Sequence, residues 1–413
     1  MPILTSAFLL ALGAMVAIRF WLATRQLAAL RRHRDEVPAP FAAAISAADH
    51  ARAADYTVAR LGLARLELLW DAVVLLGVTL GGGLAALDAW VAGFGWSPLA
   101  RGVATLGLLT LAMSAAGLPF DLYSTFRIEA RFGFNRTTLG LYLADLARSL
   151  ALGAALGVPL LALILVLMSA AGRAWWLYAW AAWVAFGLAV SFLWPRFIAP
   201  LFNRFRPLES GTLRDAVERV MQKCGFSSEG VFVMDGSRRS SHGNAYFTGF
   251  GRHKRIVLFD TLVERLVPGE VEAVLAHELG HFRLHHIRQR LLLGFAGALV
   301  GFAVLGRAAA EPGFYAALGV PTPSPHAALA LFALAVPVFT FLLAPLGSWW
   351  SRRHEYEADR FAAAHAEARL LASALVKLYR DNASTLTPDP LYSAWHDSHP
   401  PALARIAALE RGG

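Results

Sequence analysis

Long uninterrupted runs of apolar residues are the strongest constraint that this sequence places on its fold. A helix that crosses a bilayer needs about 20 mostly apolar residues. Candidate segments are 3–22, 69–91, 102–120, 150–172, 174–195, 291–305 with its continuation past Arg307, and 327–350. Because 57% of the 413 residues are apolar and only 16% are charged, the chain is not intrinsically disordered. The sequence predicts a multi-pass membrane protein with seven spans.

The basic residues predict how these spans are oriented. All but four of the 38 lysines and arginines lie in the segments after the first, third, fifth and seventh spans. Cytoplasmic loops of membrane proteins are rich in such residues. We therefore expect an N-terminus outside and a C-terminus in the cytoplasm, with the first span retained as an anchor. The net charge of +9 then reflects topology, and no nucleic-acid partner is expected.

A short motif inside the segment 270–290, which reads as a helix, suggests chemistry. His277 and His281 are one turn apart, so both imidazoles can reach one Zn²⁺ ion, and Glu278 is placed to accept a proton from the attacking water. The alternative is a pair of ordinary helix histidines near a membrane surface. A cysteine-based zinc cage is excluded because Cys224 is the only cysteine.

The third metal ligand is expected just after the seventh span. Spans six and seven should form an antiparallel hairpin, which returns the chain to the side where the histidine motif lies. Glu355 and Asp359 share one helix face there, whereas Glu357 points elsewhere. We predict Glu355 as the ligand and Asp359 as the hydrogen-bond partner of a ligating histidine. The alternative is a solvated charged face.

Further candidates flank this centre. Segments 231–235, 244–250 and 255–260 read as short strands, and the one that begins with Asn244 and Ala245 is a candidate edge strand for an extended peptide substrate. Near the C-terminus, His399 is a candidate donor to a developing oxyanion, and Arg405 follows on a helix. His285, His286 and Cys224 are expected to be structural, and His242 is left open.

These residues together resemble the type I CAAX prenyl endopeptidases, which are integral-membrane zinc metallopeptidases. The matching stretches are IEARFGFNRTT at 128–138, PRFIAPLFNRFRPLESGTL at 195–213, DGSRRSSHGNAYFTGFG at 235–251, KRIVLFDTLV at 254–263, LAHELGHFRLHH at 275–286, SRRHEYEADRFA at 351–362 and LYSAWHDSHPPALARI at 391–406. This chain has His354 where the family usually has an aromatic residue, and Glu357 where an amide is common.

The resemblance implies a mainly α-helical fold in which seven transmembrane helices form a barrel around a chamber. It implies a thermolysin-like zinc domain with a small β-sheet that caps the chamber on the cytoplasmic side. It also implies that His277, His281 and Glu355 bind one zinc ion and that Glu278 acts as the base. Asn244 and Ala245 would then hold substrate, and His399 with Arg405 would stabilise the tetrahedral intermediate or order the site.

The sequence thus predicts four regions. These are transmembrane helices 1–5 in 1–195, a peptidase region in 196–290, transmembrane helices 6 and 7 in 291–350, and a C-terminal part of the site in 351–413. The expected substrates are lipidated or unfolded peptides and proteins, met in contact with membrane lipid, and the arginine-rich composition suggests a bacterial inner membrane.

Two other functions fit parts of the sequence. One is a heat-shock-type membrane protease for quality control. The other is a transporter or lipid-binding barrel with a structural metal site, for which Arg19 and Arg307 within apolar runs are the support.

Overall fold

The computed structural model describes residues 2–226, 230–248 and 255–412. Within them, six helices are long and apolar enough to cross a membrane, and a seventh span results if one bent pair of helices counts as a single crossing. The helices of the N-terminal half are α1 (Pro2–Arg32), α2 (Ala47–Val78), α3 (Gly83–Ala92), α4 (Pro98–Tyr123), α5 (Leu139–Ala170) and α6 (Trp175–Leu193). The prediction of a multi-pass helical membrane protein is confirmed.

The second half alternates short elements with two long apolar ones. Its helices are α7 (Thr212–Lys223), α8 (Asp260–Val263), α9 (Pro268–Arg283), α10 (His286–Ala308), α11 (Pro312–Ala317), α12 (Pro325–Thr340), α13 (Ala344–His365), α14 (Ala368–Asp381), α15 (Pro390–His396) and α16 (Ala402–Gly412). Its strands are β1 (Phe205–Pro207), β2 (Gly230–Met234), β3 (Ala245–Thr248) and β4 (Arg255–Phe259).

The predicted second span, 69–91, is not one straight helix. The chain breaks between α2 and α3, which are bent by 50° relative to each other. Three consecutive glycines explain the break, because Gly82 adopts a left-handed φ of 77° that side chains other than glycine rarely take. The turn at Gly319 packs against this break so closely that a Cβ atom there would lie 2.3 Å from the Thr79 carbonyl oxygen.

A second correction concerns the predicted helix over 270–290. Helix α9 ends at Arg283, and α10 begins at His286 after a turn in which His285 has a left-handed φ of 61°. The histidine motif therefore lies on a helix of its own, which is tied to span six by a tight corner. The last span continues through α12 and α13 as predicted, so Glu355 and Asp359 lie on the helix that leaves the apolar region.

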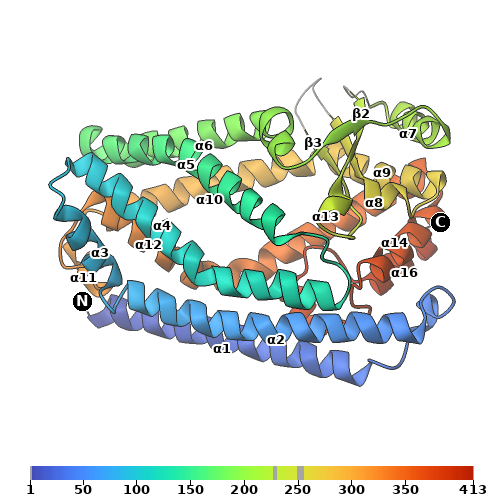
Figure 1. The fold of residues 1–413 in the computed structure, drawn as a ribbon, viewed down its shortest axis with the longest axis horizontal. Coiled ribbons are helices and arrows are strands. Elements are labelled where there is room, and N and C mark those ends of the chain that lie inside the picture. Colours follow the sequence, from blue (N-terminus) through green and yellow to red (C-terminus); the bar gives the residue numbers. More distant parts are fainter. Residues whose placement is uncertain (1, 227–229, 249–254, 413) are drawn as a thin grey trace.

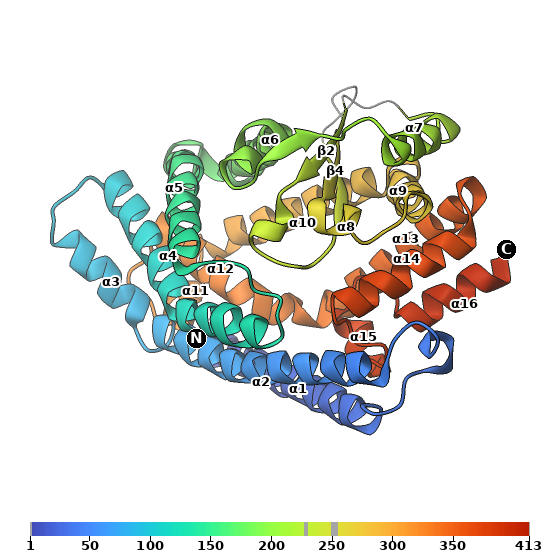
Figure 2. The ribbon, with the colours of Figure 1, turned by 45° about the vertical axis from the view of Figure 1, so that its right-hand side comes forward.

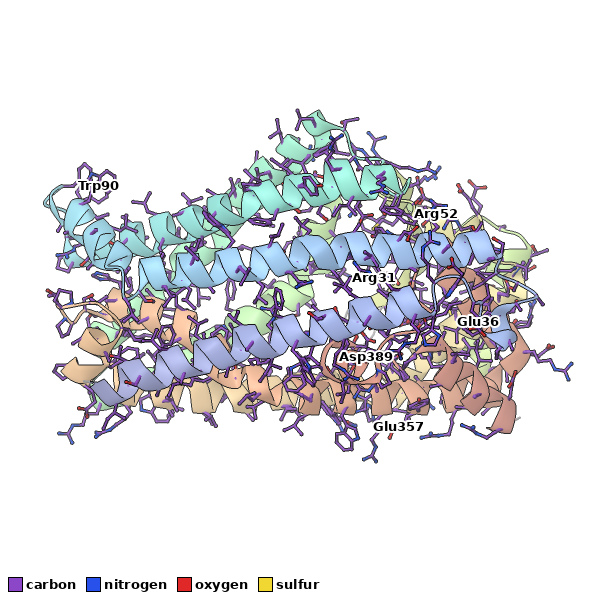
Figure 3. All side chains as sticks on the ribbon, turned by 90° about the horizontal axis from the view of Figure 1, so that it is seen from below. Arg31, Glu36, Arg52, Trp90, Glu357 and Asp389 are labelled. Atoms are coloured by element: carbon purple, nitrogen blue, oxygen red, sulfur yellow. The ribbon has the colours of Figure 1, made fainter. Side chains whose placement is uncertain are left out.

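The two ends of the elongated molecule differ in character. Figure 1 shows the N-terminus with α3 and α11 at one end, and the sheet with α7, α9, α14 and α16 at the other. Figure 3 shows exposed Trp90 at the first end and Arg31, Arg52 and Asp389 toward the second. Trp90 stacks edge-on with Phe94 at 5.1 Å, and such amphipathic aromatic residues prefer the membrane–water interface.

A polar clamp holds the helices together at the aromatic end. Asp88 on α3 accepts two hydrogen bonds from Arg101 on α4, at 2.8 and 2.5 Å, and lies 2.9 Å from the His326 ring on α12. A buried carboxylate is costly unless it is paired, so the contacts of Asp88 with Arg101 and His326 offset its burial and join three helices.

The sheet lies beside α9 at the opposite end, as Figure 2 shows. Its strand order is β1-β2-β4-β3, with β2 and β4 parallel and the other two pairs antiparallel. Strand β3 is therefore at one edge of the order, as the sequence predicted, whereas β1 was not predicted. Ala245 of β3 is buried in one hydrophobic cluster with Leu275 and Leu279 of α9, so the core of this region joins the sheet to the helix that carries the histidine motif.

Candidate metal centre

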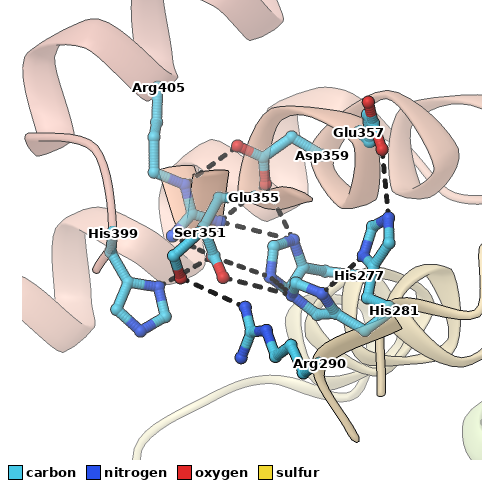
Figure 4. A network of polar contacts seen from close by, with 10 residues as sticks. His277, His281, Arg290, Ser351, Glu355, Glu357, Asp359, His399 and Arg405 are labelled. Atoms are coloured by element: carbon cyan, nitrogen blue, oxygen red, sulfur yellow. Dashed lines mark hydrogen bonds and ion pairs between the residues drawn. The ribbon is translucent and has the colours of Figure 1, made fainter. Parts of the chain in front are cut away.

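Two helices bring three potential metal ligands together. His277 and His281 come from α9 and Glu355 from α13 (Figure 4). The two histidine Nε2 atoms are 3.3 Å apart. Oε2 of Glu355 lies 3.4 Å from Nε2 of His277, and Oε1 of Glu355 lies 3.3 Å from Nε2 of His281.

These separations fit a divalent cation bound by two histidines and one carboxylate. A tetrahedral zinc ion with bonds of about 2.0–2.1 Å keeps neighbouring donors roughly 3.3–3.4 Å apart. Glu355 is only 2% exposed, and its Oε2 atom makes no hydrogen bond of good geometry, although Nδ1 of His399 lies 2.7 Å from it. A buried carboxylate oxygen without a full partner is expensive, and a metal ion would satisfy it.

The site favours positive charge even without a metal ion. Burial disfavours a charged imidazole, but the carboxylates of Asp359 and Glu355 outweigh it and raise the pKa of His277 to about 9. The donor set is therefore chemically suited to a cation.

The close approach of α9 and α13 depends on a glycine within the histidine motif. A Cβ atom at Gly280 would lie 3.1 Å from Cα of Ala358 and from Cβ of Phe361. This is tighter than ordinary van der Waals contact, so the two helices can pack this closely only because Gly280 has no side chain. The contact lets the Glu355 carboxylate reach both imidazoles across the helix interface.

The predicted partner of a ligating histidine is found at Asp359. Its Oδ1 atom lies 2.8 Å from Nδ1 of His277, on the side of the ring opposite the ligand nitrogen. Arg405 on α16 donates two hydrogen bonds to the same carboxylate, at 2.9 and 2.6 Å. Asp359 is 2% exposed and Arg405 is 6% exposed. Arg405 also lies 3.3 Å from Nδ1 of His277 and 3.8 Å from Oε2 of Glu355, so it contacts the site directly as well as through Asp359.

The other predicted catalytic residues lie around the three ligands. Glu278 is half-buried on α9 and makes no hydrogen bond with another side chain in the described part of the chain. His399 places Nδ1 2.7 Å from Oε2 of Glu355, and its side chain is 62% exposed. Because a carboxylate only accepts, Nδ1 is the donor in this contact, and Nε2 can donate to a substrate only when both ring nitrogens carry a proton.

The predicted substrate strand keeps the expected position in the sheet. Asn244 is exposed and immediately precedes edge strand β3, and its side-chain oxygen accepts a hydrogen bond of 2.8 Å from the Ala245 amide. The part of the predicted strand at 249–250 lies outside the described residues. His242, left open by the sequence, stacks on Phe134 with ring centroids 4.6 Å apart and lies 3.3 Å from the Asn382 side-chain oxygen, which is a packing role.

A second group of residues next to the ligands was not foreseen. His286, expected to be only structural, contacts both His281 and Glu357, and the His354 ring stacks on it. The spacing of five residues between His281 and His286 matches no helical face. Only the left-handed turn at His285 brings the two rings together, so periodicity gave no signal.

We expect Asp359→Asn to weaken metal binding by about 10–100-fold, the usual effect of losing an outer partner of a ligating histidine. The asparagine side chain is uncharged, whereas the Asp359 carboxylate that it replaces is negatively charged and accepts hydrogen bonds from His277 and Arg405. A chelator-competition titration measures the affinity. Asp55→Asn, which removes another Arg–Asp pair far from the site, is the matched control and should leave the affinity unchanged. Equal affinities for wild type and Asp359→Asn would contradict the role given to this carboxylate.

Comparisons with known proteins match the whole length of the fold. Residues 26–204 match a family model described as CAAX prenyl protease N-terminal, five membrane helices, and residues 207–412 match one described as Peptidase family M48. In a crystal structure of S. mikatae Ste24p, 98% of that chain superimposes on 98% of this one, with a TM-score of 0.90 and 30% sequence identity.

Curated relatives agree with this match. The CAAX prenyl protease 1 homolog of Arabidopsis thaliana is 38% identical over 294 residues, which cover 71% of this chain and 69% of the relative. CAAX prenyl protease 1 of Saccharomyces cerevisiae is 36% identical over 332 residues, covering 76% and 73%. The CAAX prenyl protease 1 homolog of Homo sapiens is 33% identical over 364 residues, covering 77% and 76%.

Proposed function

This chain belongs to the M48 family of metallopeptidases, and from that premise we propose that it uses one zinc ion, held by His277, His281 and Glu355, to hydrolyse peptide bonds. It is a membrane metalloendopeptidase of the CAAX prenyl protease type. The observation that carries the zinc assignment is the set of three donors spaced 3.3–3.4 Å apart at the junction of α9 and α13.

Each residue around the ligands has a chemical task in this proposal. Zinc, when bound, supplies a Lewis acid that polarises the scissile carbonyl and makes water a better nucleophile. Glu278 accepts the proton of the attacking water and later donates it to the leaving amine. Nδ1 of His399 donates to the Glu355 carboxylate, so its Nε2 can donate to the oxyanion that develops on the substrate when the ring carries a proton on both nitrogens.

The edge strand supplies orientation. We place the substrate backbone along β3 as an added strand, with Asn244 at the point where the strand begins. Main-chain hydrogen bonds to an edge strand hold a peptide extended, which aligns one carbonyl with the catalytic groups and excludes other conformations. Side chains contribute little to such pairing, so we expect the enzyme to tolerate a range of sequences.

The substrate class follows from the relatives. Their names describe CAAX prenyl proteases, so we propose that this chain cleaves near accessible C-terminal tails of lipidated or unfolded proteins at a membrane surface. We place the N-terminus outside and the site on the cytoplasmic side of a bacterial inner membrane, because the basic residues gather around the site-bearing segments. Regions 1–195 and 291–350 then form the membrane part, and 196–290 and 351–413 form the peptidase part.

The transporter alternative loses one of its two supports. Arg307 is 81% exposed on its side chain and pairs with Glu311 at 2.9 Å at the end of α10, so it marks a helix end instead of a pathway through the membrane.

Purified protein should contain one zinc ion per chain and should cleave a fluorogenic peptide until a chelator removes the metal. A prenylated and an unprenylated CAAX peptide, compared side by side, test the substrate class. Faster cleavage of the prenylated peptide supports CAAX processing, whereas equal rates with preferred cleavage of unfolded membrane proteins favour the quality-control protease. Cleavage that persists without metal would overturn the proposed function.

We further propose that the spans enclose a water-filled chamber around the site. The ligands lie where α10 begins and where α13 leaves the apolar region, and a polar site facing lipid directly would be costly.

Flexible tails should therefore be cut, whereas compact folded domains should resist. A folded reporter domain and its destabilised variant, both with the same tail, can be compared in detergent at equal concentration, with loss of intact domain as the readout. Equal rates of cleavage within the two domains would indicate an open surface site.

A further inference from the structure

We propose that Glu357 and His286 are positioning residues for the metal ligand His281, joined to it by a relay of two hydrogen bonds. The inference rests on the proposed metal site. In this proposal His286 and Glu357 neither bind the metal ion nor transfer a proton to or from the substrate; they orient His281.

The relay is visible in two short contacts. Nδ1 of His281 lies 2.9 Å from Nδ1 of His286, and Nε2 of His286 lies 3.1 Å from Oε2 of Glu357. His286 is 1% exposed, whereas the Glu357 side chain is 26% exposed, so the contact between the two rings is the better shielded from water. The second carboxylate oxygen of Glu357 accepts a hydrogen bond of 3.0 Å from Arg353, which orients the carboxylate.

Counting protons gives the relay one direction. His281 faces the other two ligands through Nε2, so a metal-binding His281 has its lone pair on Nε2 and its proton on Nδ1. That proton can only be donated to Nδ1 of His286, which must therefore carry a lone pair. A neutral His286 then has its proton on Nε2, where it is donated to the Glu357 carboxylate.

The neighbouring His354 ring restricts the orientation of the His286 ring. The His354 ring stacks on His286 with centroids 3.9 Å apart and an angle of 3° between the planes. Nε2 of His354 is in turn 3.1 Å from the side-chain oxygen of Gln289. The tethered His354 ring covers one face of the His286 ring and so restricts its rotation, which favours the orientation that presents Nδ1 to His281.

The same proton count argues against a second metal ion here. His286, His354 and Glu357 offer donors within 4.8 Å of one another. His286 has no lone pair left for a metal once it accepts from His281. In addition, a metal ion binds in the plane of an imidazole, and two parallel rings that are stacked share no such position.

The two ligating histidines are thus oriented differently. His277 meets the carboxylate of Asp359 directly, at 2.8 Å, whereas His281 meets a carboxylate only through another imidazole. Partners of this kind fix the tautomer and the ring angle of a ligand and raise its basicity. The relay would therefore fix the tautomer and ring angle of His281, as the direct contact with Asp359 does for His277.

Metal affinity of the full-length protein in detergent, measured by chelator competition, tests the relay. His286→Phe keeps a ring that can stack on His354 but cannot accept the His281 proton, and should weaken zinc binding by about 10–100-fold. Glu357→Ala should weaken it by about 10-fold. Glu357→Gln should stay within about threefold of wild type, because its amide oxygen still accepts from His286.

Two further measurements separate positioning from general stability. The double variant His286→Phe with Glu357→Ala should bind no more weakly than His286→Phe alone, because both changes break one relay. The visible spectrum of the Co²⁺-loaded protein should shift in His286→Phe and remain unshifted in Glu218→Ala, which removes an i,i+4 pair with Arg214 on α7 of the same kind as the Arg353–Glu357 pair.

Each outcome has one meaning. Unchanged zinc affinity in His286→Phe and in Glu357→Ala would overturn the relay, and so would additive losses of affinity in the double variant. If the wild-type protein still binds a single zinc ion, either result leaves the proposed function intact. A second zinc ion that is lost in Glu357→Ala would overturn the relay in favour of a second metal site. Failure of wild type to bind zinc at all would overturn the proposed function itself.

Discussion

Glu278→Gln is expected to abolish peptide hydrolysis while the protein keeps its fold and its zinc ion. The side chain lies between the two ligating histidines on α9 but is not itself one of the three clustered donors. An amide of the same size cannot accept a proton from the attacking water. General-base catalysis contributes about 10²–10⁴-fold, so the rate should fall by about that factor.

A matched variant on the same helix makes this test specific. Glu272→Gln makes the same chemical change about 1.7 turns away, at a carboxylate that pairs with Arg219 and Lys223 on α7. It should retain near-normal turnover, since a partly exposed ion pair contributes little. Initial rates with a fluorogenic peptide, normalised to metal content, compare the two. Near-normal turnover in Glu278→Gln would remove the proposed mechanism.

Glu355→Ala is expected to have the largest effect on metal content. It removes one of three protein donors and also leaves His399 without its 2.7 Å partner. The affinity for zinc should fall by more than about 100-fold. This exceeds the loss of about 10–100-fold that is typical when a residue that only hydrogen-bonds to a metal ligand is removed. Glu357→Ala should cost much less, because the two side chains leave the helix about 200° apart and Glu357 reaches the metal only through two histidines.

Metal analysis after equilibration with a fixed zinc buffer distinguishes these variants. Glu355→Ala should be nearly metal-free in a buffer that half-saturates Glu357→Ala. The reverse order would mean that α13 is rotated relative to α9 and that the third ligand has been misassigned. Glu367→Ala, beyond the end of α13, provides a matched substitution that should leave the zinc content at the wild-type level.

Apolar length and helical spacing were enough to predict the membrane helices and the main site. A run of 20 apolar residues has few stable forms other than a buried or spanning helix, so the predicted spans fall on observed helices, although α1, α2, α5 and α13 extend well beyond the predicted bounds. His277 and His281 lie one turn apart whatever surrounds them, and the expected hairpin of spans six and seven brought Glu355 near them. The edge position of β3 also agreed with the prediction.

Other features escaped because they depend on backbone conformations that sequence patterns do not display. The left-handed residues Gly82 and His285 end two helices that periodicity alone would continue. Strand β1 has only three residues, too few to show an alternating pattern. The contact of Arg405 with Asp359 joins two different helices, and the spacing of residues along the chain gives no sign of it.

The sequence by itself therefore determined two features. The chain spans a membrane because its apolar runs are long enough to cross one, and His277 with His281 can share a metal ion because the pitch of a helix places them one turn apart. Only the tertiary structure decided how those histidines are supported. The close packing at Gly280, the hydrogen bonds from Arg405 to Asp359, and the turn that sets His286 beside His281 each join residues from different helices. Such contacts are set by how whole helices pack, and that packing depends on every residue at their interfaces.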